Sequence, residues 1–200
     1  MLIYQDKVPS NIRTAFIAKI KEVSSYLNID PNWLMAVINF ESAGTFSPSI
    51  ENHITGATGL IQFMPNTAQS LGTTVSALSR MSGVQQLDYV KQYYNPYKTK
   101  IKSYIDLYFA TFFPIAIGKA GNYVLQTSRI PPGVIATSNP IFDINKDGKI
   151  TKQEVETVML SRIPANLIHL VQTNKTISLF GVVVFAAAAY YGGKKLKLWE

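Results

Sequence analysis

The segment FESAGTFSPSIENHITGATGLIQFMP, residues 40–65, determines the interpretation of this chain. A carboxyl residue, Glu41, closes an apolar run and is followed by Ser42 and Gly44. About twenty residues later comes the short run Gly59–Phe63, which reads GLIQF. Because glycine lets the backbone approach a ligand closely, this spacing predicts an irregular lobe over 45–63, with a short β-ribbon at most, beside a functional carboxyl group.

A helix is expected directly before this lobe. Asp30 is a good N-cap and Pro31 suits the first helical position, so the helix should begin here and end near Gly44, with Glu41 in its last turn. The residues before Glu41 are mostly apolar, and a helix C-terminus carries partial negative charge. Both conditions disfavour a charged carboxylate, so Glu41 is expected to keep the proton that a general acid needs.

The two motifs resemble those of the soluble lytic transglycosylase family, a phage-type version of it, which is related to goose-type lysozymes. That family carries Glu-Ser, then Gly-Leu-Met/Ile-Gln, and usually Ala-Tyr-Asn, and the first two match at 41–42 and 59–62. The resemblance extends over roughly residues 20–120. The third motif departs from the pattern, because the chain has LYFATFFP at 107–114, where Tyr108 is the candidate for the family's tyrosine.

The resemblance implies a mainly α, lysozyme-like (α+β) fold and cleavage of the MurNAc–GlcNAc β-1,4 bond of peptidoglycan. Glu41 would first protonate the leaving oxygen and then act as base, while the muramyl 6-hydroxyl attacks C1 and gives a 1,6-anhydro product. The predicted substrate-binding residues are Ser42, Gln62, Phe63 and Tyr108. The amide of Gln62, with one acceptor and two donor hydrogens, suits an N-acetyl group or a sugar hydroxyl.

Two alternatives stay open at this point. Hydrolysis with two carboxylates would need a second one about 5–9.5 Å from Glu41. Glu51 and Asp106 are the available candidates, and neither is compelling. The chain could also be a hydrolytic lysozyme, or a structural virion or membrane protein that keeps a lysozyme-like scaffold.

The chain divides into a lysozyme-like transglycosylase domain over 1–125, a connecting segment with a calcium loop over 126–170, and an apolar segment over 176–193. Within residues 1–170, periodicity and turn residues predict helices and one connection, over 119–140. The helices are expected over 10–27, 65–71, 74–80, 83–94 and 98–113, and from the calcium loop to about 162.

Residues 143–154, DINKDGKITKQE, match the calcium-binding loop of EF-hands. Oxygen ligands are expected at positions 1, 3, 5, 7 and 12, with glycine at position 6 for the sharp turn. The predicted Ca²⁺ ligands are Asp143, Asn145, Asp147, the carbonyl of Lys149, and Glu154. Thr151 and Glu154 also fit a capping box for the following helix, and the two readings are compatible. Since one loop alone is evident, the ion is expected to be structural and to take no part in catalysis.

The run 176–193 has 18 residues without a charge, followed by three lysines within four residues. As a helix it would be about 27 Å long, the low end for a membrane span. The run predicts a C-terminal transmembrane anchor. The anchor would hold the catalytic domain in the periplasm, facing the cell wall, or it would lie in the membrane or vertex of a bacteriophage virion. The alternatives are a buried helix of a complex or a terminal helix docked on the domain. The N-terminus lacks the pattern of a signal peptide.

Composition narrows the class of protein further. The net charge of +7 over 200 residues favours anionic partners, but no nucleic-acid-binding motif is present. We therefore expect peptidoglycan glycan strands, a membrane and other virion proteins as partners, and no nucleic acid. The absence of cysteine excludes disulfides and a cysteine nucleophile, and His53 and His169 have no metal-ligand spacing.

Overall fold

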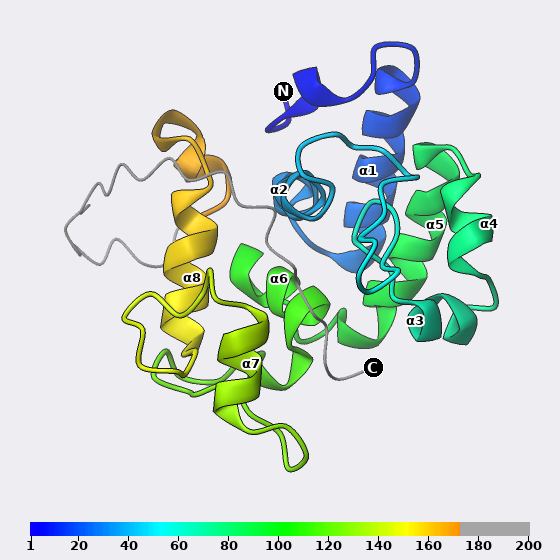
Figure 1. Ribbon diagram of the computed structural model, residues 1–200. Helices are drawn as coiled ribbons and strands as arrows, with labels where there is room; N and C mark the ends of the chain where they lie inside the picture. Colours follow the sequence, from blue (N-terminus) through cyan, green and yellow to red (C-terminus); the bar gives the residue numbers. More distant parts are fainter. Residues whose placement is uncertain (173–200) are drawn as a thin grey trace.

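The computed structural model describes residues 1–172, and it is mainly helical (Figure 1). The α-helices are α1 (Arg13–Leu27), α2 (Pro31–Glu41), α3 (Pro65–Ser70), α4 (Val75–Ser79), α5 (Gly83–Tyr94), α6 (Tyr104–Phe112), α7 (Pro132–Ser138) and α8 (Lys152–Ser161). The 3₁₀ turns are η1 (Gln5–Lys7), η2 (Asn95–Tyr97), η3 (Pro114–Ala116) and η4 (Ala165–Leu170). Within residues 1–172, β-structure is limited to isolated bridges.

Helices α2 and α6 form the centre of the fold. In α2 every residue from Trp33 to Ile38 is buried, and in α6 all nine residues are buried. Helices that are apolar on all sides belong in a protein interior. Helix α2 packs against both α1 and α6, and α1 packs in turn against α5. In Figure 1, α1 and α5 lie on one side of this central pair and α8 lies on the other.

The core continues past residue 125, where the sequence suggested a boundary. Phe142, Ile150, Val155 and Met159 belong to the same buried cluster as α2 and α6. The N-terminal residues join this core as well. The amide N–H of Ile3 donates to Asn32 Oδ1 at the start of α2 (2.9 Å). The loop before α8 is therefore packed directly against the core formed by α2 and α6.

Two predicted helical boundaries were wrong. A helix was expected over 98–113, but α6 begins at Tyr104, because Ser103 caps it by accepting a hydrogen bond from the N–H of Asp106 (3.0 Å). Helix α7 lies in the segment 119–140, for which the sequence predicted a connection. Pro132 occupies its first position, where the missing N–H of proline costs no helical hydrogen bond.

Among residues 1–172, no helix combines the length and the apolar character needed to cross a membrane. The run 176–193, for which the sequence predicts a transmembrane anchor, lies outside the described residues.

Candidate active site

Glu41 is the last residue of α2 and is only 7% exposed. The helix that carries it starts as expected, with Asp30 Oδ1 accepting a hydrogen bond from the N–H of Asn32 (2.7 Å) and with Pro31 at the first position. Because the body of α2 is buried on all sides, the carboxyl group is held at a fixed depth by the core. A carboxyl group shielded in this way can deliver a proton to a bond pressed against it.

The turn after Glu41 is held by Ser42. The Ser42 hydroxyl is fully buried and accepts a hydrogen bond from the N–H of Phe46 (3.0 Å), and its carbonyl accepts from the Thr45 hydroxyl (2.7 Å). Ala43 and Gly44 both have positive φ, which reverses the chain within a few residues. The expected contact of Ser42 with substrate is therefore replaced, in the structure, by a contact that fixes the direction of the chain leaving Glu41.

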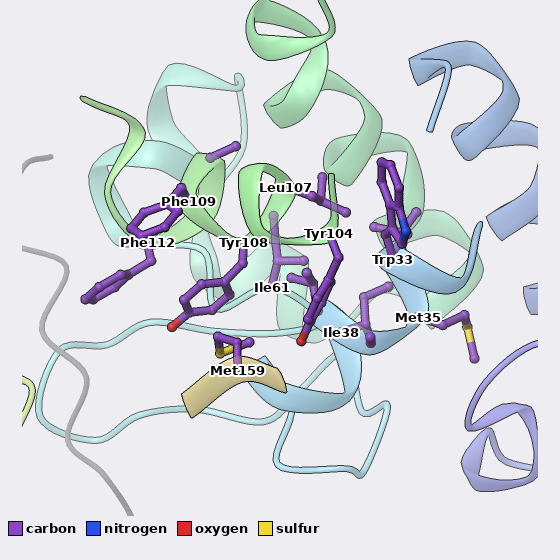
Figure 2. Packing of buried hydrophobic residues seen from close by; sticks show 14 of the residues in the cluster. Trp33, Met35, Ile38, Ile61, Tyr104, Leu107, Tyr108, Phe109, Phe112 and Met159 are labelled. Carbon is purple, nitrogen blue, oxygen red and sulfur yellow. The ribbon is translucent and has the colours of Figure 1, made fainter. Parts of the chain in front are cut away.

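Three buried tyrosines lie within electrostatic reach of Glu41. They are Tyr94, at the end of α5, and Tyr104 and Tyr108, on α6. Burial raises the pKa of each hydroxyl, and the negative charge of Glu41 raises each pKa further. In Figure 2, Tyr104 and Tyr108 extend from α6 with their hydroxyl ends toward the same side. All three therefore remain neutral phenols, which can donate a hydrogen bond where a phenolate could not.

Tyr108 is also fixed by its ring. The ring packs edge-on against Phe40 (5.5 Å between centroids), stacks with Phe112 (5.6 Å) and contacts Phe142 (6.0 Å). Phe40 directly precedes Glu41, so the aromatic contact ties α6 to the end of α2. Sequence reasoning selected Tyr108 and missed Tyr94 and Tyr104. The four-residue spacing of Tyr104 and Tyr108 on one helix was the available signal for Tyr104.

The lobe that follows Glu41 contains a short antiparallel pairing. Thr58 and Phe63 exchange backbone hydrogen bonds (2.9 and 2.8 Å), and Thr58 also bridges to Glu51, which agrees with the expected β-ribbon. Gln62 is half-buried at φ 55°, and its amide donates to the carbonyls of Gly59 (3.2 Å) and Ile50 (3.3 Å). Gln62 therefore holds two carbonyls of its own lobe.

Phe63 is 1% exposed, so its expected contact with substrate does not fit the structure. Its ring lies edge-on to that of Tyr93 (6.1 Å), which belongs to α5. The backbone pairing with Thr58 turns this side chain inward, where burial of a phenylalanine stabilises the fold more than exposure would. Phe63 anchors the lobe to the helical core.

Gln86 on α5 is the residue that the sequence did not suggest and that fixes the lobe most directly. It is fully buried, its Oε1 accepts from the N–H of Leu60 (2.7 Å), and its Nε2 donates to the carbonyls of Pro48 and Leu78 (both 3.0 Å). A Cβ on Gly59 would collide with this side chain, and Gly59 has φ +86°. The glycine that begins the GLIQF run therefore leaves the space that the Gln86 side chain occupies.

The other two candidate carboxylates are used elsewhere. Asp106 Oδ2 accepts from the N–H of Lys102 (3.1 Å), and Oδ1 lies 3.8 Å from the ammonium of Lys152 on α8. Glu51 is exposed in the lobe. Asp106 is as buried as Glu41 (8% against 7% exposed), but both of its carboxylate oxygens already have partners in Lys102 and Lys152.

A surface hollow of about 410 Å³ lies away from Glu41, which is not among its lining residues. It is formed by α3, the end of α5, η2 and the start of η3. Its lining residues are Asn66, Thr67, Ser70, Leu71, Gln92, Tyr93, Pro96, Tyr97 and Pro114.

The predicted calcium ligands lie on the loop before α8 and on its first turn. Glu154 forms the capping box with Thr151 that the sequence also allowed, since the N–H and the hydroxyl of Thr151 both donate to Glu154 Oε2 (2.8 Å each). Among residues 1–172, no three or more His, Asp or Glu side chains gather closely enough to hold an ion by themselves. Any ion on this loop would also need amide or carbonyl oxygens.

Part of the chain is similar to a known protein family. Residues 19–99 match the model of the Transglycosylase SLT domain. The SLT match includes Glu41, Ser42, Gln62 and Phe63, and it ends before Tyr108. It supports a lytic-transglycosylase-like function for this region, with peptidoglycan as the substrate. No curated protein and no solved structure matches the chain.

Proposed function

We propose that the chain is a lytic transglycosylase that cleaves the MurNAc–GlcNAc β-1,4 bond of peptidoglycan with Glu41 as its acid and base. The observation that carries this proposal is the setting of Glu41: a carboxyl group 7% exposed at the end of a buried helix, within electrostatic reach of three buried tyrosines whose pKa values it raises. The SLT match at 19–99 supports the same class of reaction.

In the first step, the Glu41 carboxyl group donates its proton to the glycosidic oxygen as the C1–O bond breaks. In the second, the resulting carboxylate takes the proton of the muramyl 6-hydroxyl, whose oxygen forms a bond to C1. The product is a 1,6-anhydro ring, Glu41 regains its proton, and no water is consumed. A single carboxylate is sufficient for both steps, which agrees with the separate contacts of Asp106 and Glu51.

The tyrosines have a defined part in this scheme. Their pKa values are raised by burial, so their hydroxyls stay protonated while the charge on Glu41 changes. A neutral phenol can stabilise the transient carboxylate by donating a hydrogen bond and can release it when Glu41 is protonated again. Of the three, Tyr108 is the one whose ring contacts Phe40, the residue directly before Glu41.

The test measures muropeptide release from purified sacculi by the full chain, by Glu41→Gln and by Glu51→Gln as the matched control. Loss of the acid should lower the rate by about 10²–10⁴-fold, with an unchanged circular dichroism spectrum, whereas Glu51→Gln should keep wild-type activity. Full activity of Glu41→Gln would refute the proposal. Mass spectrometry of the products should show anhydro ends. Reducing ends would indicate a hydrolytic lysozyme, and binding without turnover would indicate a structural scaffold.

We propose separately that the uncharged run 176–193 anchors the chain in a membrane, either of the bacterial host or of a virion, with the catalytic domain facing the cell wall. The length and the trailing lysines support this location. Deletion of 176–200 should move the protein from the membrane fraction to the supernatant after high-salt washing. Equal fractionation of the two proteins would overturn this proposal.

A further inference from the structure

The loop between Phe142 and α8 wraps around the carboxylate of Asp143. Gly148, at φ 77°, directs its N–H to Asp143 Oδ2 (3.1 Å). The N–H of Asp147 donates to Asn145 Oδ1 (3.0 Å), and the N–H of Lys149 donates to Asp147 Oδ1 (2.9 Å). The first half of the loop thus turns its side-chain oxygens toward its own centre.

Two carboxylate oxygens of this loop are buried without a hydrogen-bond partner. Asp143 is 9% exposed, and while its Oδ2 binds Gly148, its Oδ1 has no partner among the described residues. Glu154 Oε2 caps α8, and Oε1 is likewise buried and unbonded. Within residues 1–172, neither carboxylate forms an ion pair. A buried carboxylate oxygen that lacks a partner is costly, so this pair of oxygens indicates a missing positive ligand.

We propose that residues 143–154 form a Ca²⁺ site that braces the active-site wall. A hard cation with six to eight oxygen ligands is suited to carboxylates supplemented by amide and carbonyl oxygens, and Ca²⁺ tolerates such mixed, flexible sets better than Mg²⁺ does. The ligands are side-chain oxygens of Asp143, Asn145, Asp147 and Glu154 together with the carbonyl of Lys149. Glu154 can keep its cap through Oε2 while Oε1 binds the ion.

Both ends of the loop are attached to α6, the helix that carries Tyr108. At the first end, Phe142 is buried next to Asp143, and its ring packs on Phe112 (4.9 Å) and Tyr108 (6.0 Å). At the second end, Lys152 lies 3.8 Å from Asp106 of α6. Figure 2 shows Met159, from the body of α8, next to Tyr108.

The loop is also hydrogen-bonded to the segment 123–125, which precedes α7. The N–H of Leu125 donates to Ile150 (2.8 Å), and the N–H of Lys152 donates to Tyr123 (2.9 Å). An ion that draws Asp143 and Glu154 together therefore clamps Phe142 and α8 onto α6. The effect on catalysis rests on the proposed function of Glu41, whereas binding of the ion does not.

Thermal unfolding and calorimetric Ca²⁺ titration of the chelator-treated full chain test the site without any substrate. Saturating Ca²⁺ should raise the Tm by about 3 °C or more, and equal Mg²⁺ should raise it less. In wild type, Ca²⁺ should also change the near-ultraviolet circular dichroism of the tyrosines. A wild-type chain with no heat of Ca²⁺ binding and no rise in Tm would overturn the proposal.

The variant Glu154→Gln tests ion binding without removing the helix cap. Glutamine also serves in a capping box, but it offers the ion one oxygen where the carboxylate offers two. This variant should unfold at the wild-type Tm in chelator and lose the rise caused by Ca²⁺. Lys149→Ala is the matched control and should keep the full rise, since only its backbone carbonyl is a ligand. A full Ca²⁺ response in Glu154→Gln would also refute the site, whatever the activity of Glu41.

Discussion

Replacing Gly59 with alanine tests how the GLIQF run is held in place. Gly59 has φ +86°, a backbone conformation that costs an alanine about 1–2 kcal/mol. The added methyl group would also displace the buried side chain of Gln86 and break its three hydrogen bonds, each worth about 1 kcal/mol. We expect a total destabilisation of about 4–5 kcal/mol, which for a chain of this size lowers the Tm by roughly 12 °C.

Gly72 offers the matched control. It has a similar φ of +75°, but a Cβ there meets no atom within 4 Å. Gly72→Ala should therefore cost the backbone share alone, about 1–2 kcal/mol, and lower the Tm by roughly 3–6 °C. Both variants are compared with wild type by circular dichroism melting of the full chain in one buffer.

A double substitution isolates the collision from the backbone cost. In a Gln86→Ala background the obstructing side chain is gone, so adding Gly59→Ala should cost no more than Gly72→Ala costs in wild type. The two single effects should then fail to add. Equal Tm values for Gly59→Ala and Gly72→Ala, or simple additivity with Gln86→Ala, would show that Gln86 does not impose glycine at position 59.

Two further predictions concern single side chains. Tyr108→Phe keeps the ring contacts with Phe40, Phe112 and Phe142 but removes the hydroxyl near Glu41, so sacculus turnover should fall about 10-fold with a change in Tm of less than 3 °C. Unchanged turnover would exclude a part for the hydroxyl. The second prediction concerns the pair of Lys19 and Asp88, in which the Lys19 ammonium lies 2.8 Å from Asp88 and lowers the pKa of the Asp88 carboxyl group. The pair therefore stabilises the fold above about pH 4. This stabilisation is lost as the pH falls through the lowered pKa. Asp88→Asn should flatten the acid limb of the Tm–pH curve and change the Tm little at pH 7, because the pair is partly exposed, and coinciding acid limbs would contradict this.

The sequence was sufficient for the elements that depend on local signals. The cap at Asp30 and Pro31 correctly predicted where α2 begins, and the apolar run up to Phe40 correctly predicted a buried helix with Glu41 in its last turn. The helix ends at Glu41, slightly before the expected end near Gly44. The Thr151-x-x-Glu154 spacing correctly predicted the capping box of α8. In each case the interacting groups are within a few residues of one another, so the contact can be predicted from the local sequence.

The features that the sequence did not predict depend on contacts between distant segments. Gln86 follows Gly59 by 27 residues, and Tyr94 comes 53 residues after Glu41. Nothing in the local pattern distinguishes Gln86 from a solvated glutamine on an amphipathic helix, because its three partners are brought to it by the packing of the lobe against α5. The same holds for Tyr94, whose position at the end of α5 suggests ordinary core packing.

Three residues of the recognisable motif form structural contacts around Glu41 and its lobe. Ser42 holds the turn after Glu41, Gly59 leaves room for the side chain of Gln86, and Phe63 is buried in the core. These residues lie within the region that matches the SLT domain model, and they hold the chain around one carboxyl group. Contacts that select a particular glycan strand must come from side chains that remain exposed, and in this lobe those include Ser49, Glu51, His53 and Ile54. Because these side chains are exposed, a substrate could contact them without disturbing the buried core of the lobe.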